Sequence, residues 1–327
     1  MTSLMQAIIC DQGQLRLVQR PIPQPCAGEV RIRIAYAGVN RADLLQTQGL
    51  YPPPEGASDI LGLEVSGHID ALGDNIHQWQ TGDAVCALVS SGAYADYVTL
   101  PAAHCMRIPA PLTLAESAGI MECALTVWMS LFDEARLKSG EAVLVHGGSS
   151  GIGTTAIQML RAYGCPVFAT ASTATKCALI EQLGATAINY KTDDFVAPIK
   201  ASGGVDVVLD MVGGDYIMRN MQCLRAGGRL MSIACLQSTQ VNLGMGGLLM
   251  KGLSWKGSTL RRRCDTDKAQ LIAAMQPHLQ HWIATGAFKP VIDRIFPLQQ
   301  ADKALETMQQ GLHCGKILLQ VGSAQAS

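Results

Sequence analysis

The periodicity of apolar and polar positions divides the chain into three stretches. In the first third, short runs such as residues 30–36 alternate apolar and polar side chains, which is the pattern of half-buried β-strands. Between residues 115 and 132 the apolar positions recur at helical spacing. Beyond residue 140, short apolar runs alternate with helical segments, as a parallel doubly wound sheet requires. The pattern therefore predicts a β-rich domain followed by an α/β domain.

The first stretch predicts a small, partly open β-barrel, because short strands follow one another at near-regular spacing. Residues 7–10 and 15–18 form a predicted hairpin around Gly13, and a short helix is expected to begin near residue 40. The further predicted strands are 30–36, 61–69, 82–88 and 92–98.

The α/β stretch predicts a series of strands at 142–145, 167–170, 187–189, 205–209 and 229–233, with 253–257 as a candidate for one more. Gly164, Gly184 and Gly227 are candidate C-caps of the helices between them. Four elements follow, namely a helix from 265 to about 285, a strand at 290–295, a helix at 299–310 and a strand at 316–321. We expect the last strand to return to the first domain. This assigns 1–122 and 265–327 to the barrel domain and 123–264 to the α/β domain.

Residues 140–161, GEAVLVHGGSSGIGTTAIQMLR, contain a buried-strand pattern, a glycine-rich turn and the start of a helix in succession. Glycines let the backbone approach a pyrophosphate, and a helix N-terminus offers free N–H groups and a positive dipole. A glycine motif alone is weak evidence, but here a strand precedes it and a helix follows it. We predict that the turn binds a dinucleotide through Gly148, Ser150, Gly151, Ile152 and Gly153.

Composition and charge exclude several other classes of protein. The formal net charge is −1 over 327 residues, which argues against a chain held to DNA or RNA mainly through phosphates. No apolar run approaches a membrane span, and the first ten residues lack the cationic segment of a signal peptide. The 11 cysteines are scattered without a CxxC pair, as is typical of buried thiols in a reducing compartment. We expect a cytoplasmic globular protein.

These motifs resemble a known family. The order of barrel domain, nucleotide domain and returning C-terminus resembles the medium-chain dehydrogenase/reductase superfamily, and 140–161 resembles the glycine signature of its zeta-crystallin and quinone oxidoreductase branch. VNRADLLQTQGLYPPPEGASDILGLEVSGHI (39–69) resembles the barrel-domain motif of that branch, and HCGKILL (313–319) resembles its terminal strand. VNRAD and the tyrosine before the prolines also recur in the tumour-suppressor-inducible quinone oxidoreductase subgroup. The resemblance implies a GroES-like barrel domain and a Rossmann domain.

The resemblance also bears on metal binding. Zinc-dependent relatives carry a cysteine and a GHE histidine where this chain has Asn40 and Leu63, and an amide and a leucine do not complete a tetrahedral zinc site. Cys123 lies near the place of a third ligand, but a buried apolar cysteine explains it. His278 and His281 share a helix face, for which a solvated surface is the simpler explanation. We expect no metal.

The end of the second α/β strand indicates the cofactor. NAD-specific sheets place an acidic residue about twenty positions after the glycine turn, whereas residues 169–176 read ATASTATK without a carboxylate. Small hydroxyl residues and a lysine suit a 2′-phosphate, so we predict NADPH. An ordinary solvated charge is the alternative for Lys176. The resemblance implies a cofactor site that includes Ser172, Lys176 and Tyr190 around the 2′-phosphate, and also Gly213, Arg261 and Lys316.

Hydride transfer needs groups that stabilise negative charge on the acceptor oxygen. The barrel-domain motif supplies Asn40 and Tyr51 as donors, and we expect Asp43 to orient them or their loop. Instead of acting as donors, Asn40 could be a turn residue, and Tyr51 could be an exposed ring held by Pro52–Pro54. Nothing resembles an activated serine or cysteine nucleophile.

Together these residues indicate an NADPH-dependent, zinc-independent reductase of quinones or related conjugated carbonyls. An alkenal or enone double-bond reductase is the alternative enzyme, because the sequence does not separate the two hydride acceptors. A crystallin-like or RNA-binding role is the non-enzymatic alternative, since zeta-crystallin relatives act as lens proteins or bind RNA. Its one support is the basic cluster Arg261–Arg263 with Lys251 and Lys256, and we expect neither nucleic acid nor a membrane as partner.

Residues 241–257 are apolar and glycine-rich and lead into the last predicted strand of the α/β domain. In relatives this edge pairs with its two-fold mate, so the resemblance implies a homodimer. A mobile loop is the alternative.

Overall fold

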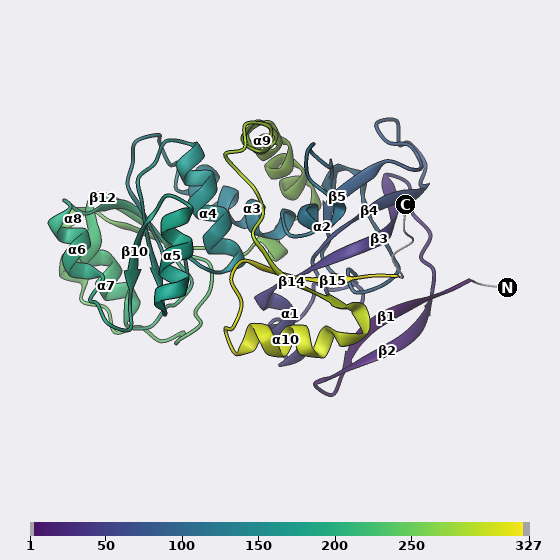
Figure 1. Ribbon diagram of the computed structural model, residues 1–327, viewed down its shortest axis with the longest axis horizontal. Coiled ribbons are helices and arrows are strands. Elements are labelled where there is room, and N and C mark those ends of the chain that lie inside the picture. The colour runs from purple at the N-terminus through teal and green to yellow at the C-terminus, as the bar shows by residue number, and fades with distance from the viewer. Residues whose placement is uncertain (1–2, 323–327) are drawn as a thin grey trace. The chain divides into compact units, whose positions relative to one another are not determined.

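The computed structural model describes residues 3–322 and divides the chain into two compact units (Figure 1). The barrel unit contains the chain up to Glu122, Arg261–Ala284, and the chain from Pro290 onward. The parallel-sheet unit contains Cys123–Leu260 and Thr285–Lys289.

This division differs from the sequence-based boundaries at two places. The sequence assigned Arg261 to the α/β domain, whereas the structure places it in the barrel unit. Its guanidinium donates hydrogen bonds to Gln46, Tyr51 and Ser90 of that unit. Residues 285–289 return to the parallel-sheet unit, where the Lys289 amide donates to Gln158 Oε1 at 2.9 Å. Side-chain anchors of this kind have no signature in local periodicity.

The barrel unit is built on a mostly antiparallel sheet with the strand order β14-β15-β3-β4-β5-β7, and β6 also pairs with β3. The strands of the unit are β1 (Leu4–Asp11), β2 (Gln14–Pro21), β3 (Glu29–Val39), β4 (Glu64–Leu72), β5 (Ala84–Leu88), β6 (Tyr97–Pro101), β7 (Cys105–Arg107), β14 (Ile292–Pro297) and β15 (Lys316–Gln320). Strands β1 and β2 pair with each other in a separate two-stranded sheet. Strand β15 pairs antiparallel with β3, with Ile317 opposite Val39. The prediction that the last strand returns to the first domain is therefore confirmed.

The predicted hairpin is confirmed as β1–β2. Its turn places Gln12 and Gly13 at positive φ, as two-residue hairpin turns require. Isolated bridges from Ala7 to Ala95 and from Ile9 to Ile60 tie the hairpin to the rest of the unit. The strand predicted at 92–98 was placed too early, because the observed β6 begins at Tyr97.

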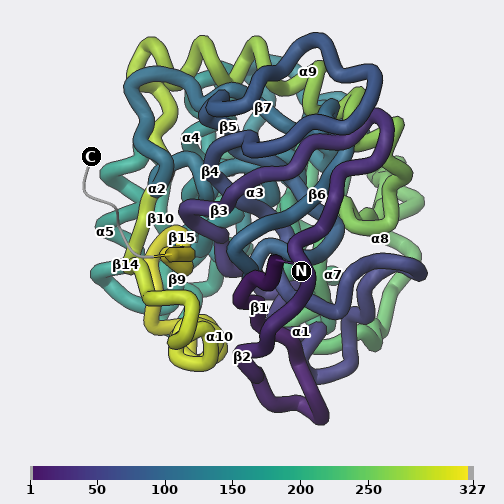
Figure 2. Tube along the Cα trace, turned by 90° about the vertical axis from the view of Figure 1, so that its right-hand side faces the viewer, coloured from purple at the N-terminus to yellow at the C-terminus, as the bar shows by residue number. Residues whose placement is uncertain are grey.

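The helical elements of the barrel unit are α1 (Arg41–Thr47), η1 (Ala102–His104), α2 (Leu114–Ser117), α9 (Asp265–Ala284), η4 (Leu298–Gln300) and α10 (Ala301–Gln309), and η3 (Leu260–Arg262) spans the boundary. Figure 2 shows α10 beside β14 and β15. Ala304 and Leu305 of α10 join Ile317 and Leu319 of β15 in the buried core. No helix within residues 3–322 has the length and apolarity needed to cross a membrane.

The parallel-sheet unit has the strand order β10-β9-β8-β11-β12-β13, with every pair parallel. The strands are β8 (Val143–Val145), β9 (Val167–Ala171), β10 (Thr186–Asn189), β11 (Val205–Asp210), β12 (Leu224–Ser232) and β13 (Ser254–Gly257). The helical elements are α3 (Met121–Val127), which crosses the unit boundary, η2 (Trp128–Glu134), α4 (Gly151–Ala162), α5 (Ala174–Gln182), α6 (Val196–Ala201), α7 (Tyr216–Cys223) and α8 (Met245–Lys251).

The strand order reverses at β8, because the chain passes from β8 to β9 and β10 on one side and returns with β11 on the other. Ligands of doubly wound sheets bind at the carboxyl ends of the strands at such a switch point. The three residues of β8 are fully buried, as the apolar run predicts. The predicted Rossmann-type sheet is confirmed.

The prediction of a helix cap at Gly227 was wrong, and the helical stretch 115–132 is divided. Gly227 is not a helix cap but lies inside β12, at φ +73° in the irregular stretch between Leu224 and Arg229, which both pair with β11. The helical stretch 115–132 breaks into α2, α3 and the π-helical segment η2. The break falls at Gly119, where a Cβ would lie 3.0 Å from Lys316 Cγ, so the chain yields space to that side chain.

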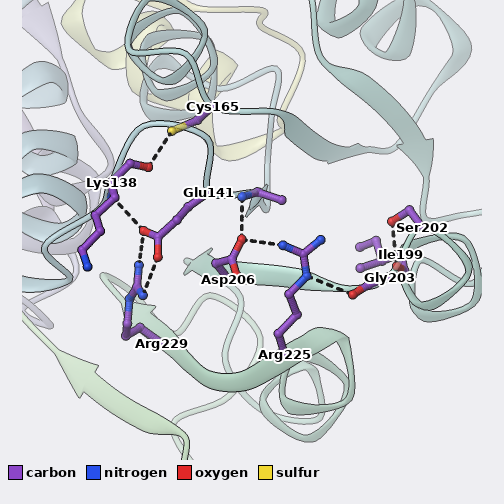
Figure 3. A network of polar contacts seen from close by, with 10 residues as sticks. Lys138, Glu141, Cys165, Ile199, Ser202, Gly203, Asp206, Arg225 and Arg229 are labelled. Carbon is purple, nitrogen blue, oxygen red and sulfur yellow. Dashed lines mark hydrogen bonds and ion pairs between the residues drawn. The ribbon is translucent and has the colours of Figure 1, made fainter.

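Two ion pairs fasten the sheet at the end of β8 that lies away from the glycine-rich turn (Figure 3). The Arg229 guanidinium donates to both oxygens of Glu141, at 3.0 and 2.6 Å. Asp206 accepts hydrogen bonds from the Ala142 amide and from Arg225, each at 2.7 Å. Strands β8, β11 and β12 are thereby held in register below the turn.

Candidate functional site

The glycine-rich turn of the parallel-sheet unit connects β8 to α4. Ser150 is the N-cap of α4, and its side chain accepts a hydrogen bond from the Gly153 amide at 3.0 Å. Gly151 and Ile152 occupy the first helical positions, where amides have no acceptor within the helix. These N–H groups and the helix dipole suit a bound phosphate.

Three glycines shape this turn. Gly147 has φ +66°, a left-handed conformation that side chains disfavour. A Cβ on Gly153 would lie 2.2 Å from the Gly147 carbonyl oxygen, and one on Gly148 would lie 2.7 Å from Ala169 Cβ. Close packing of the turn against the sheet therefore requires glycine, and the resulting cradle of backbone fits the pyrophosphate of a dinucleotide.

A buried polar cluster supports the turn from below. His146 Nδ1 lies 3.0 Å from Thr170 Oγ1, and His146 Nε2 lies 2.7 Å from Asn220 Oδ1. The Gly148 amide donates to the Thr170 carbonyl at 2.8 Å. Burial lowers the pKa of His146 to about 4, so the imidazole is neutral near pH 7. The histidine acts as a fixed hydrogen-bonding spacer rather than as a charge.

The residues predicted around a 2′-phosphate follow the paired ends of β9 and β10. Asn189 of β10 pairs with Ala171 of β9, and the Tyr190 amide donates to the Ala171 carbonyl at 3.0 Å. Ser172 and Tyr190 therefore leave neighbouring strands at the same edge. Lys176 lies in the first turn of α5, where its amide donates to the N-cap Thr173 at 3.3 Å.

Gly213 follows β11 at the same edge of the sheet. Its amide donates to Asp210 Oδ2 at 3.1 Å, and its φ is +72°. A Cβ there would lie 2.7 Å from the Ser238 carbonyl oxygen, so this crossing of two loops requires glycine. The structure thus brings the predicted turn, Ser172, Tyr190 and Gly213 to the carboxyl edge of one sheet.

The predicted residues of the barrel unit belong to a buried charged network. Lys316 Nζ donates to Asn40 Oδ1 at 2.7 Å and to the Val39 carbonyl at 2.9 Å, and it forms an ion pair with Glu64 Oε1 at 2.7 Å. The Asn40 amide nitrogen Nδ2 donates to Glu64 Oε1 at 2.9 Å. The Glu64 side chain is fully buried, and Lys316 is almost so. Both ends of the Asn40 amide are therefore engaged within the unit.

Asp43 links this network to two further groups. Its Oδ2 accepts hydrogen bonds from the backbone N–H of Asn40 at 2.8 Å and from the Tyr94 hydroxyl at 2.9 Å. Burial raises the pKa of Asp43 to about 6, although these hydrogen bonds and the charge of Lys316 lower it. Asp43 Oδ1 has no hydrogen-bond partner among the described residues.

Glycines make room for this network too. A Cβ on Gly38 would lie 2.3 Å from Glu64 Oε1, so the carboxylate fits only beside glycine. Gly62, at φ +95°, leaves space for the Tyr94 ring, which a Cβ would meet at 2.4 Å. Gly38 and Gly62 are thus required by the packing of the buried network.

Tyr51 is held by Arg261. The guanidinium donates to the Tyr51 carbonyl at 3.1 Å and lies 5.2 Å from the centre of the tyrosine ring. It also donates to Ser90 O at 3.2 Å and to Gln46 Oε1 at 2.6 Å. Arg261 thereby fixes the loop that carries Tyr51.

Sequence reasoning missed Glu64, Tyr94 and Glu122. The Glu122 amide donates to Glu64 Oε2 at 3.0 Å, and burial together with Glu64 raises the pKa of the Glu122 carboxyl to about 8. The triplet Gly62–Glu64 marked the position of Glu64 in the sequence, but nothing local indicated its burial. Tyr94 and Glu122 carried no local signal.

The side chains at positions 40 and 63 do not supply the ligands of a zinc site. Leu63 is buried and has no donor atom, and Asn40 Oδ1 already accepts from the Lys316 ammonium. Among residues 3–322 no three His, Cys, Asp or Glu side chains are grouped to hold a metal ion. Asn40 and Glu64 instead contact the ammonium of Lys316.

Comparison with known proteins gives matches over nearly the whole chain. Residues 26–110 match the family described as alcohol dehydrogenase GroES-like domain, and residues 151–276 match zinc-binding dehydrogenase. The chain is 30% identical to the synaptic vesicle membrane protein VAT-1 homolog of Rattus norvegicus, covering 94% of this chain and 81% of the relative. It is 30% identical to a quinone oxidoreductase of Sus scrofa, covering 87% and 86%. The crystal structure of CurK enoyl reductase superposes with a TM-score of 0.86 at 26% identity, covering 98% of this chain and 100% of that one.

Proposed function

The chain belongs to the medium-chain dehydrogenase/reductase superfamily, and from that premise we propose that it is an NADPH-dependent, zinc-independent reductase of quinones or related conjugated carbonyls. The observation that carries the proposal is the Asn40–Lys316–Glu64 network, in which the Lys316 ammonium contacts the side chains of Asn40 and Glu64. The 30% identity to a quinone oxidoreductase over most of both chains supports the quinone subclass.

NADPH fits the parallel-sheet unit. The turn Gly148–Gly153 would hold the pyrophosphate, and Ser172, Lys176 and Tyr190 would hold the 2′-phosphate. The strand end between them lacks the carboxylate that NAD-specific sheets use for the ribose. Bound NADPH supplies the hydride for the reaction.

The barrel unit supplies the groups that act on the acceptor. The Tyr51 hydroxyl would donate a hydrogen bond to the acceptor oxygen, where negative charge accumulates as hydride arrives. Arg261 holds the tyrosine loop in position for that contact. Asn40 and Asp43 act one step back, since their side chains hold Lys316, Glu64 and Tyr94.

Single-turnover oxidation of bound NADPH by a simple quinone tests the function. We expect Tyr51→Phe to slow hydride transfer less than the roughly hundred- to thousandfold loss seen for an oxyanion donor, because a quinone needs little activation. NADPH affinity, measured separately by fluorescence, should stay near the wild-type value. Wild-type hydride transfer in Tyr51→Phe would assign the donor role to another group, and no oxidation by any quinone or enone would reject the reductase.

The cofactor preference has its own test. Loss of one charge-assisted contact costs on the order of 1.5–3 kcal/mol, which is roughly ten- to a hundredfold in affinity. Lys176→Ala should therefore weaken NADPH by that factor and leave NADH nearly unchanged, while the exposed Lys200→Ala on α6 serves as a matched control. Equal losses for both cofactors would contradict the 2′-phosphate site.

An enone or enoyl double-bond reductase is the second candidate. The superposition on CurK enoyl reductase over the full length of that structure favours it. A turnover screen with matched quinones and enones separates the two, because the preferred acceptor shows the higher kcat/KM.

We further propose a homodimer formed through the edge of the parallel sheet. Strand β13 is exposed along its whole length, and Leu249 and Met250 of the adjoining α8 are 69% and 88% exposed. A second copy of the chain would cover this edge and the apolar side chains beside it. Sedimentation that finds only monomer at micromolar concentration would reject the dimer.

A further inference from the structure

The barrel unit contains a cavity of about 1130 Å³. The loop 50–60 with Tyr51 forms one wall, and the segment 261–268 at the start of α9 forms another. The cavity is larger than most small-molecule pockets, so it has room for more than a quinone ring.

Two cations in this wall are buried without a carboxylate at hydrogen-bond distance, although Asp43 and Glu122 interact electrostatically with Arg261. Arg261 is 6% exposed, and its hydrogen bonds go to two backbone carbonyls and one amide oxygen, all of them neutral. Lys268 is 4% exposed and donates to Ser90 Oγ at 2.9 Å. Its nearest carboxylate is Asp265 at 3.7 Å, which is 65% exposed to solvent. A buried charge is costly unless something of opposite sign compensates it.

Further charges face the same cavity. Arg262 is exposed and has no ion pair among the described residues, and Arg263 lies 3.8 Å from Asp267. Of the other acidic groups on the lining, Asp59 pairs with Arg20 at 2.9 Å and Glu29 accepts from the Cys26 amide. Glu55 of the loop 50–60 has no hydrogen bond or ion pair among the described residues. The 261–268 wall therefore has an excess of positive charge, next to the tyrosine of the proposed site.

We propose that the wall formed by Arg261, Arg262 and Lys268 binds an anionic group, a carboxylate or a phosphate, on the substrate of the reductase. The inference rests on the proposed function and narrows its substrate to conjugated carbonyl compounds that bear a negative charge. The Lys268 ammonium has three N–H groups, and the Ser90 hydroxyl accepts a hydrogen bond from only one of them. The anion adds to the neutralisation of the Lys268 charge, which the solvent-exposed Asp265 carboxylate provides only weakly.

The test compares 4-oxopent-2-enoate with its methyl ester, which share the enone and differ in charge. We expect wild-type kcat/KM to favour the acid by roughly ten- to a hundredfold, the factor for one charge-assisted contact. Lys268→Gln should lower this acid-to-ester ratio at least about tenfold, and Arg262→Gln should lower it by a smaller factor. Lys303→Gln, an exposed lysine outside the cavity on α10, is the matched control and should leave the ratio unchanged.

Arg262 is exposed, so its variant remains informative even if Lys268→Gln fails to fold. An acid-to-ester ratio near one in the wild type would overturn the inference. An equal loss of kcat/KM for both compounds in Lys268→Gln would also overturn it. A loss of NADPH affinity with an unchanged acid-to-ester ratio would do so too, and would indicate that these cations bind the cofactor instead. Calorimetric binding of the acid and not the ester, without any turnover, would reject the reductase while supporting the anion site.

Discussion

Replacing Lys316 by methionine tests the buried network most directly. Lys316→Met keeps most of the side-chain volume but removes the ammonium that lies 2.7 Å from Glu64 and 2.7 Å from Asn40. The Glu64 carboxylate then stays fully buried with only the Asn40 side chain and the Glu122 amide as donors. An uncompensated charge remains where an ion pair stood.

The expected cost follows from that geometry. Removing one partner of a buried ion pair destabilises a protein by about 3–5 kcal/mol. At about 1.4 kcal/mol per tenfold change, this is a factor of at least roughly one hundred in the opening equilibrium of the barrel unit. The double variant Glu64→Gln/Lys316→Met should recover at least about 1 kcal/mol, because no uncompensated charge is left.

Hydrogen exchange measured by mass spectrometry reports this opening locally. Amides of Ile317–Leu319 in β15 should exchange at least roughly a hundredfold faster in Lys316→Met. Amides of Val207–Leu209 in β11 belong to the other unit and provide an internal control. Lys303→Met, on the exposed surface of α10, controls for loss of a lysine. Less than fivefold acceleration in β15, or a double variant no better than Lys316→Met, would refute the reasoning.

Three further outcomes are expected. The pKa of Asp43 is raised to about 6 from 3.8, so keeping Asp43 ionised costs the folded state about 3 kcal/mol above pH 6 and nothing below pH 4. The stability of the wild type relative to Asp43→Asn should therefore fall as pH rises from 4 to 6. Urea unfolding at several pH values measures this difference, and a difference that does not change with pH would contradict the assignment. Gly62→Ala should cost about 2–4 kcal/mol in unfolding free energy, because its Cβ would meet the Tyr94 ring at 2.4 Å and its φ is +95°, whereas exposed Gly246→Ala should cost little. Activity should survive exhaustive chelation, and one zinc per chain with chelator-sensitive turnover would overturn the zinc-independent assignment.

Much of the fold was readable from local patterns. The hairpin β1–β2, the strand–turn–helix around Gly151 and the strand at 316–321 were all predicted, because periodicity and turn residues act over a few neighbouring positions. The predictions failed where a distant contact overrides local preference. Gly227 was read as a helix cap, yet it lies within β12, between Leu224 and Arg229, whose pairing with β11 continues the strand past it.

The chemistry of the barrel unit depended on tertiary structure. Asn40 and Lys316 are 276 positions apart, and their hydrogen bond decides that the Asn40 amide serves Lys316 and Glu64. The sequence by itself determined the order of elements, the glycine turn and the residue types at the site, since these follow from local sterics and amphipathic spacing. Only the folded chain decided which charges lose contact with water and which partners compensate them, because desolvation and pairing arise between residues that the sequence keeps far apart.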